Sequence, residues 1–272
     1  MEVRRIAGAL GAEVLGVDLA GTLSEAAVAE IRRAFLEHQV IFFREQSLDP
    51  AQFMAFARRM GKPIEYPFVI GIEGFPEVIE VKKLEHEKHN FGGIWHSDTA
   101  DLGLPSMGPM LLARGFPAAG GDTEFASQYL AYESLSEGMR RLLDPLAGVN
   151  SSAKADVSRT REDRIKEQGG ESRQYLAEHP VVRTHPETGR KALYVNCAHT
   201  ASFKGMTEEE SAPLLQYLFR HQVRAEFTCR FHWRVGSLAF WDNRCTQHNP
   251  INDYHGQRRV MHRITLAGDR PR

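Results

Sequence analysis

Apolar residues recur every three or four positions over residues 24–38, the spacing that places side chains on one face of an α-helix. Thr22 and Glu25, just before this run, have the spacing of a capping box. We therefore predict a helix over about 24–38. Its buried face comprises Val28, Ile31 and Phe35.

Two further helices are predicted from their start signals. Asp49 precedes a proline and lies three residues before Gln52, and Gly61 follows at a suitable distance to end the helix. Thr207 and Glu210 form a second pair with capping-box spacing. The helix that begins there carries Leu214, Leu215 and Leu218.

Short apolar runs bounded by turn residues dominate the rest of the chain and indicate strands. They are VIFF (40–43), PEVIEV (76–81), PMLLAR (109–114) and SLAFW (237–241). The segment VVRTHPETGRKALYV predicts a hairpin around Pro186 and Gly189. Many short strands with a few helices favour a mainly β fold with flanking helices, a sandwich or jelly roll, over a doubly wound sheet. Neither a dinucleotide fingerprint nor a P-loop is present.

One compact domain over residues 1–272 is expected, because the chain contains no repeat, low-complexity tract or linker-like stretch. The segment KADVSRTREDRIKEQGGESR (154–173) differs from its surroundings, with eleven charged side chains and little apolar periodicity. A solvated helix or mobile loop over about 150–176 is the simpler interpretation. A lid over an active site is the alternative.

Composition narrows the classes of partner. The formal net charge of −1 gives no overall basic field for nucleic acid or an anionic membrane. Glu13 and Asp18 interrupt the apolar start of the chain, which argues against a signal peptide, and no stretch approaches the roughly 20 apolar residues of a spanning helix. The three cysteines form no C-x-x-C motif. We therefore expect a reduced, cytoplasmic protein without nucleic-acid or membrane partners.

The sequence IWHSDTA (94–100) places His96 and Asp98 two positions apart between apolar stretches. In a strand, residues at this spacing project to the same face. With a second, distant histidine they would form a 2-His-1-carboxylate triad, which suits non-haem Fe(II) oxygenases. A structural hydrogen bond between the two side chains is the simpler alternative.

The C-terminal region supplies candidates for the rest of such a site. His248 follows the predicted strand 237–241, and Arg259 and Arg263 lie four residues apart in a segment that alternates weakly. Arginines that face the interior beside a metal are costly unless an anion accompanies them, and a dicarboxylate would serve. A surface cluster of arginines is the alternative.

Four motifs in this order resemble the taurine/2-oxoglutarate dioxygenase family, which also includes 2,4-dichlorophenoxyacetate and alkylsulfate dioxygenases. They are WHSD (95–98), GGDTEFAS (120–127), TQH (246–248) and QRRVMHR (257–263). The resemblance covers nearly the whole chain. It implies a double-stranded β-helix, or jelly roll, with flanking helices.

The resemblance also implies the roles of individual residues. The implied Fe(II) ligands are His96, Asp98 and His248. The 2-oxoglutarate cosubstrate would bind the metal at one end, and Arg259 and Thr123 would hold its far carboxylate. Arg263 would contact an anionic group of the substrate or support the cosubstrate. The hydroxyl of Thr123 can donate to a carboxylate, which agrees with this assignment.

The implied reaction uses O2 to convert 2-oxoglutarate to succinate and CO2 while a small, anionic organic substrate is hydroxylated. Hydroxylation beside oxygen, sulfur or nitrogen would then break that bond. A related oxidase that performs desaturation or ring formation is the alternative; halogenation is disfavoured because Asp98 leaves no vacant place for halide. A non-catalytic jelly-roll ligand-binding protein and a zinc hydrolase are the rivals from other classes. The family commonly forms dimers or tetramers, so a homo-oligomer is expected.

The chain departs from the taurine enzymes around the expected substrate pocket. Asn196 and His199 lie in a segment that lines this pocket in those enzymes, where an aromatic residue takes the place of His199. Phe68 stands near the place of their sulfonate-binding histidine, and Gly92 replaces an asparagine. These differences favour a substrate with a more apolar body than taurine.

Other polar and aromatic residues near the motifs have simpler expected roles. Trp95 and Trp241 are expected to pack in the core, and Asn243 is expected to satisfy backbone groups at a strand end. Asp122 is interpreted as a turn residue rather than a base. His262 lies between the two arginines in an alternating segment and should face away from them.

Overall fold

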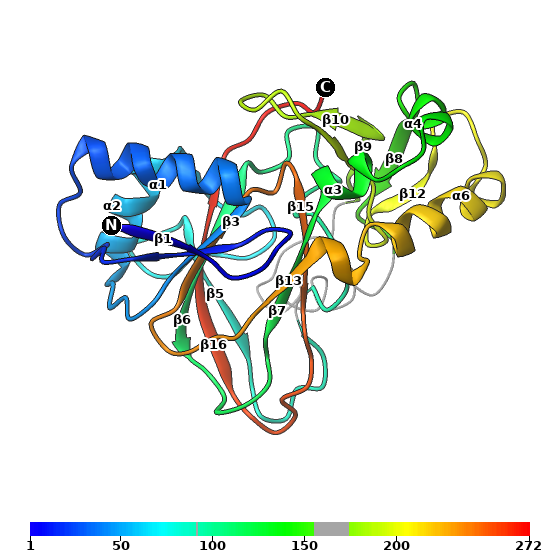
Figure 1. Cartoon of the computed structure of the whole chain (residues 1–272). Coiled ribbons are helices and arrows are strands. Elements are labelled where there is room, and N and C mark those ends of the chain that lie inside the picture. The colour runs from blue at the N-terminus through cyan, green and yellow to red at the C-terminus, as the bar shows by residue number, and fades with distance from the viewer. Residues whose placement is uncertain (91, 155–173) are drawn as a thin grey trace.

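The computed structural model describes residues 1–90, 92–154 and 174–272, and it is mainly β with several helices. Figure 1 shows α1 and α2 on one side of the molecule and α3, α4 and α6 with β8–β12 on the other. The strands β6, β16, β7 and β15 run between these two groups. In the described part of the chain, no helix is long and apolar enough to cross a membrane.

The largest sheet contains eight strands, in the order β1-β2-β3-β14-β6-β16-β4, with β5 also paired to β16. All its pairings are antiparallel except that of β2 with β3. The strands are β1 (Glu2–Arg5), β2 (Ala12–Leu15), β3 (Val40–Phe43), β4 (Pro63–Ile64), β5 (Val78–Lys83), β6 (Gly108–Gly115), β14 (Leu238–Trp241) and β16 (Arg259–Leu266).

The other strands of the described residues form three smaller sheets. The first has the order β13-β7-β15, with β13 (Thr228–Phe231), β7 (Thr123–Ser127) and β15 (Thr246–Pro250). The second has the order β12-β8-β9, with β12 (Thr200–Phe203), β8 (Ala147–Ser151) and β9 (Leu176–Pro180). The third is the expected hairpin, β10 (Val182–Thr184) with β11 (Lys191–Leu193).

The helices begin largely where their capping residues predict. In α2 (Pro50–Met60), Asp49 and Gln52 form the expected capping box, and the helix ends at Gly61. In α6 (Glu208–His221), Thr207 and Glu210 form another. The remaining helices are α1 (Glu25–His38), α3 (Gln128–Glu133), α4 (Glu137–Leu143) and the 3-10 turn η1 (Ala225–Phe227).

Two local predictions need correction. The helix α1 is capped by Ser24, whose hydroxyl accepts from the backbone N–H of Ala27, and not by the predicted pair of Thr22 and Glu25. A serine adjacent to the first helical residue reaches the free N–H groups without distorting the chain, so it takes the cap. The strand predicted at 76–81 lies two residues later, at β5, because the turn of residues 72–75 closes first. The charged segment 154–173 falls, apart from Lys154, outside the described residues.

Both faces of the large sheet are buried, as β3 illustrates. Ile41 and Phe43 pack toward α1 and α2 in one apolar cluster, whereas Val40 and Phe42 belong to a second cluster. The second cluster includes Phe125 of β7, so it fills the space between the large sheet and the sheet of β13, β7 and β15. The continuous run VIFF in the sequence follows from this double burial. The candidate site is built between these two sheets.

Phe35 should contribute strongly to stability, since it is fully buried and its ring stacks on Phe240 at 4.0 Å between centroids. We expect Phe35→Ala to lower the free energy of unfolding by about 3–5 kcal/mol, because it leaves a cavity between helix and sheet. Urea denaturation measures this change. Leu142→Ala is the control, as that side chain is 51% exposed and its loss should change stability by less than about 0.5 kcal/mol. Equal effects of the two variants would contradict the assigned packing.

Candidate metal centre and adjoining pocket

His96 and His248 are brought together by their own backbones. The N–H of His96 donates to the carbonyl of His248 at 3.1 Å, and the N–H of His248 donates to the carbonyl of His96 at 2.9 Å. This reciprocal pair is an isolated antiparallel bridge between residue 96 and β15. Residues paired in this way project to the same face, and the two imidazole centroids are 4.2 Å apart.

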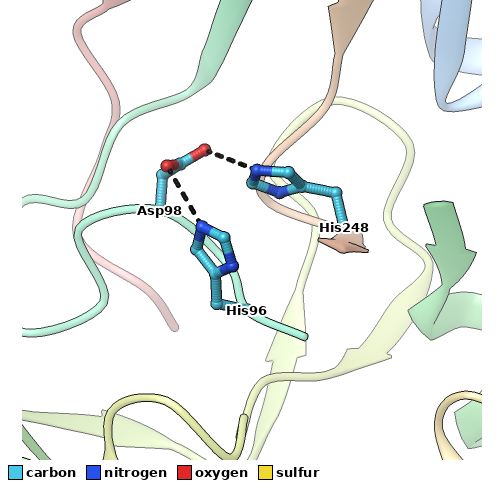
Figure 2. Close-up of side chains that lie close together, drawn as sticks. All are labelled: His96, Asp98 and His248. Atoms are coloured by element: carbon cyan, nitrogen blue, oxygen red, sulfur yellow. Dashed lines mark ion pairs between the residues drawn. The ribbon is translucent and has the colours of Figure 1, made fainter. Parts of the chain in front are cut away.

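Asp98 reaches the same point through a turn. The expectation that His96 and Asp98 share a strand face is wrong, because only His96 pairs with a strand and Asp98 begins a turn. Thr99 then adopts a positive φ of 54°. This turn directs the carboxylate of Asp98 toward both imidazoles (Figure 2).

Asn243 fixes the backbone of Asp98 on both sides. Its Oδ1 accepts from the Asp98 N–H at 2.7 Å, and its Nδ2 donates to the Asp98 carbonyl at 2.9 Å. The same Nδ2 donates to the carbonyl of Ser106, which closes the turn. The expectation that Asn243 satisfies backbone groups is therefore confirmed, and those groups belong to the carboxylate residue of the triad.

The three side chains have the spacing and burial of a metal site. The Nε2 of His96 lies 3.8 Å from Asp98 Oδ1, and the Nε2 of His248 lies 4.0 Å from Asp98 Oδ2. All three donor atoms fall within 4.8 Å of one another, and all three residues are buried. Two imidazoles and one carboxylate on one side of an ion leave its other positions open for ligands.

The protonation states also suit a metal. The Nδ1–H of His96 donates to the carbonyl of Ile94 at 2.7 Å when Nε2 carries the lone pair, so Nε2 is directed to the centre. Burial lowers the pKa of His96 and, more strongly, that of His248, which favours neutral imidazoles. Burial alone would raise the pKa of Asp98, but the Arg263 guanidinium and the imidazoles outweigh it and the pKa is lowered.

A buried carboxylate oxygen of Asp98 also indicates that these residues fit a cation. Asp98 Oδ2 is buried and accepts no hydrogen bond from the described residues. A buried carboxylate oxygen without a donor is unfavourable. A divalent ion bound by both imidazoles would satisfy it, so the donor set fits a metal.

A second cluster of potential ligands does not fit a metal. The Nε2 of His185 donates to Asp242 at 3.0 Å, and its Nδ1 accepts from the backbone N–H of Thr188 at 3.1 Å. Asp242 also accepts from Arg244 at 2.8 and 2.7 Å. Burial raises the pKa of Cys245 well above its usual value, so its thiol stays protonated. This cluster is a satisfied structural network.

A pocket extends from the metal triad between β6, β15 and β16. It is lined by Val81, His96, Leu111, Thr123, Trp233, Trp241, His248, Pro250, Arg259 and Arg263. Arg259 lies at its polar end near the ring of Trp233, with 5.9 Å from the guanidinium carbon to the ring centroid. The indole N–H of Trp233 donates to the Thr123 hydroxyl at 3.0 Å, which leaves the hydroxyl proton free to point to a pocket ligand.

Arg263 faces the metal end of this pocket. Its Nη2 lies 2.9 Å from Asp98 Oδ1, and its guanidinium lies over the ring of Tyr66 at 5.0 Å. Arg259 and Arg263 share one face of β16 with Met261, as the predicted alternation requires. The expectation that His262 faces the other way is confirmed, since it is only half-buried between the two buried arginines.

Phe68 lies in an apolar cluster that leads away from Arg263. Its ring packs edge-on against Tyr66 at 5.3 Å and against Tyr175 at 5.5 Å. Val69 and Ile79 belong to the same cluster, with Leu102 packed against it. Tyr66 therefore joins the guanidinium of Arg263 to an apolar surface.

Asn196 and His199 are bonded to each other, and His199 lies near His96. The Nδ1 of His199 lies 3.0 Å from Asn196 Oδ1, and its Nε2 lies 3.7 Å from Asp101. The rings of His199 and His96 are 6.4 Å apart. Both residues are buried beside the triad, where they shape the wall next to His96.

Gly92 lies where the backbone passes close to His96 of the triad. Its φ is +73°, and a Cβ there would lie 2.9 Å from the Cε1 of His96. A side chain at this position would therefore require the His96 imidazole or the backbone of Gly92 to shift.

The structure agrees with some of the roles expected for the neighbouring residues and disagrees with others. Trp241 is buried and its ring lies 4.7 Å from that of His248, so it packs against a ligand. Trp95 remains partly exposed, and the core role expected for it does not hold. Asp122 is not placed as a base, because it accepts from Arg230 at 2.7 Å and from His232 at 2.8 Å.

Three contributors to the site carry no sequence signal that would have identified them. Trp233 and Phe116 border Arg259, and Tyr66 lies under Arg263. Each comes from a segment without a motif, and single aromatic residues are more often core than site. Only the folded chain places them against the two arginines.

Removal of the Asn243 amide should weaken metal binding although all three metal-ligating side chains remain. We expect Asn243→Ala to lower the affinity for Mn(II) by about 10- to 100-fold, because the Asp98 backbone loses both of its bonds to this side chain. Titration calorimetry measures the affinity. Gln46→Ala is the control, since it removes another buried amide that bonds backbone groups, here of Val17 and Leu19, outside the pocket. A similar loss of affinity in both variants would show a general effect on folding.

Metal binding should resist mild acidification. Burial lowers the pKa values of both histidines from the ordinary imidazole value, so the imidazoles stay neutral and available as the pH falls toward that ordinary value. We expect the Mn(II) affinity to change little from about pH 8 to 6.5 and to fall at lower pH, as protons compete for the ligands. Electron paramagnetic resonance of free Mn(II) across this range measures it. A steep loss already between about pH 8 and 7 would contradict the lowered pKa values.

Comparison with known proteins agrees with this geometry. The family model described as "Taurine catabolism dioxygenase TauD, TfdA family" matches residues 2–265. An alpha-ketoglutarate-dependent sulfate ester dioxygenase from Pseudomonas putida is 36% identical over 278 residues, which span 100% of this chain and 91% of that protein. An alkylsulfatase from Acinetobacter baylyi is 34% identical, over 99% of this chain and 86% of that protein.

A solved structure gives the same result for the fold. The crystal structure of a taurine dioxygenase from Burkholderia xenovorans superposes with a TM-score of 0.85 at 37% identity, covering 99% of this chain and 92% of that one. Sequence and structure thus match the same family over nearly the full length. The crystal structure of AAD-2 in complex with Mn(II) and N-oxalylglycine also superposes, with a TM-score of 0.81 at 27% identity, covering 99% of this chain and 98% of that one. The chain belongs to the TauD/TfdA family of alpha-ketoglutarate-dependent dioxygenases.

Proposed function

We propose that this enzyme uses Fe(II) and 2-oxoglutarate to hydroxylate a small organic substrate that carries an anionic group on an apolar body. The single observation that carries the proposal is the pocket that joins the His96–Asp98–His248 triad to Arg259 and Thr123. We also infer a single catalytic domain with a jelly-roll core, supported by the match of the family model to residues 2–265.

The metal would be held by His96, Asp98 and His248, and with 2-oxoglutarate and O2 it supplies the oxidation that yields succinate, CO2 and a hydroxylated carbon. The protein itself holds the metal ligands in position. The reciprocal backbone pair of the two histidines and the clamp of Asn243 on Asp98 keep the three ligands in place. The burial of all three excludes bulk water from the reacting centre.

Arg259 and Thr123 are suited to the far carboxylate of 2-oxoglutarate. The Nε and Nη2 of Arg259 are buried and have no hydrogen-bond partner among the described residues. A guanidinium in that state gains two charge-assisted bonds from one carboxylate. Thr123 lies in the same pocket with its hydroxyl proton available, because its oxygen already accepts from Trp233.

Arg263 and the apolar cluster of Phe68 support the choice of substrate. An anionic group beside Arg263 would lie next to the metal, and Tyr66 and Phe68 would offer an apolar surface to the body of the substrate. Relatives that act on sulfate esters make such esters the first candidates. Hydroxylation of the carbon that bears the ester oxygen gives an unstable adduct, which collapses to an aldehyde and releases sulfate.

Asn196 and His199 would form the wall of the substrate site beside His96, where the taurine enzymes have an aromatic residue. A desaturation or ring-forming outcome would need the same cofactors and is separated only by the product. A ligand-binding protein or a zinc hydrolase would need no 2-oxoglutarate. The arrangement of Arg259 and Thr123 therefore favours the dioxygenase.

The test is anaerobic addition of Fe(II) and 2-oxoglutarate to the apoprotein, followed by visible spectroscopy. We expect a charge-transfer band of the chelate that is absent in Asp98→Ala, which lacks a metal ligand, and that requires about 10-fold or more 2-oxoglutarate in Arg259→Ala. Arg258→Ala is the control, since that side chain is exposed beside Glu85. Screening of alkyl sulfates by succinate release then defines the substrate. Iron binding without the band would contradict the proposal.

A further inference from the structure

Lys83 is a buried cation at the end of β5, and only 4% of its surface is exposed. Lysine is almost never buried to this extent unless it is paired. Lys83 and Arg259 are direct partners in the antiparallel pairing of β5 with β16. Residues paired in this way project to the same face of the sheet, so both cations enter the same side of the large sheet.

Neither of these cations forms an ion pair with a carboxylate of the described residues. The Nζ of Lys83 donates to the neutral amide of Asn252 at 2.6 Å and lies 4.2 Å from the centroid of the Tyr254 ring. Burial is the main cause that lowers the pKa of Lys83; the charge of Glu87 opposes it, and the smaller effect of Arg259 adds to the lowering. Two buried nitrogens of Arg259 have no hydrogen-bond partner within the described residues. Across residues 1–90, 92–154 and 174–272, no ion pair joins either side chain to an acid.

Two adjacent buried cations that form no ion pair are costly, because like charges repel strongly where water is excluded. An anionic group bound at Arg259 removes part of this cost for both side chains. A ligand that lacks charge at that end leaves the cost in place. The pair of cations therefore favours the binding of a ligand with a second carboxylate more strongly than a single arginine would.

We propose that Lys83 is a specificity residue of the cosubstrate pocket, which acts with Arg259 to select 2-oxo acids that carry a second carboxylate. The inference rests on the proposed binding of 2-oxoglutarate at Arg259. Lys83 acts through its charge rather than through contact, since its ammonium bonds Asn252. Arg259 provides the directional bonds, and Lys83 raises the positive potential around them.

The neighbouring Lys82 provides a matched control. It precedes Lys83 in β5, so its side chain projects to the opposite face, and it forms an ion pair with Glu80 at 2.6 Å. Lys82→Met and Lys83→Met remove the same charge from adjacent positions. Lys83→Arg keeps the charge, and Lys83→Gln removes it while retaining a polar group that can reach Asn252.

The experiment compares two ligands of equal chain length on the Fe(II)-loaded, anaerobic proteins, using the charge-transfer band to measure dissociation constants. 2-Oxoglutarate has the distal carboxylate, and 2-oxopentanoate lacks it. We expect Lys83→Met and Lys83→Gln to weaken 2-oxoglutarate by about tenfold and to leave 2-oxopentanoate within about twofold. Lys83→Arg and Lys82→Met should preserve the discrimination between the two ligands.

Unchanged discrimination in both neutral variants of Lys83 would overturn the inference. An equal loss for both ligands would also overturn it, because that result indicates altered packing around Tyr254. Thermal unfolding of each variant shows whether it is folded, and Lys83→Gln provides the measurement if Lys83→Met is not. Absence of the band in the unmodified protein would contradict the proposed function instead, so the two failures are distinguishable.

Discussion

The reciprocal backbone pairing of His96 with His248 is the interaction on which the site depends. It is a single antiparallel bridge, yet it joins the turn that carries Asp98 to the strand that carries the second histidine. Because a backbone pair fixes both direction and distance, it places two imidazoles on one face without any help from side chains. The amide of Asn243 then adds the third ligand by holding the Asp98 backbone. Preorganisation of the metal ligands is thus a property of the chain's own hydrogen bonding.

The strand β16 shows how the same fold handles buried charge in two ways. Arg263 is paired with Asp98, so its charge is compensated within the protein. Arg259, four residues earlier on the same face, has no such partner, and its strand neighbour Lys83 adds a second positive charge. A protein selected only for stability would place an acid or an apolar residue there. A dicarboxylate bound at Arg259, as proposed above, would compensate this deficit of negative charge.

Aromatic rings pack around these buried charged side chains. Trp233 and Phe116 flank Arg259, Tyr66 underlies Arg263, and Trp241 packs on His248. Flat rings exclude water while their faces still attract cations, so they let guanidinium groups remain buried in a narrow pocket. The cluster around Phe68 adjoins Tyr66 and so extends this apolar surface. The division between a charged inner end and an apolar outer surface matches the substrate class proposed above.

Sequence alone determined the parts of this protein that local physical chemistry decides. The caps at Asp49 and Thr207, the hairpin around Gly189 and the alternation of Arg259, His262 and Arg263 all follow from backbone preferences over a few residues. Ordered motifs over the whole length were enough to indicate the family, which the comparisons show. The triad residues were also identified from these motifs.

Tertiary structure alone decided the features that join distant segments. Asp98 reaches the metal centre through a turn with Thr99 at positive φ, which a His-x-Asp spacing read as a strand could not reveal. The contacts of Asn243 with Asp98 span 145 residues, and the pairing of Lys83 with Arg259 joins two strands that lie far apart in the sequence. Burial and charge compensation depend on every neighbour in space. Sequence patterns therefore indicated the candidate residues, and only the fold determined which of them meet.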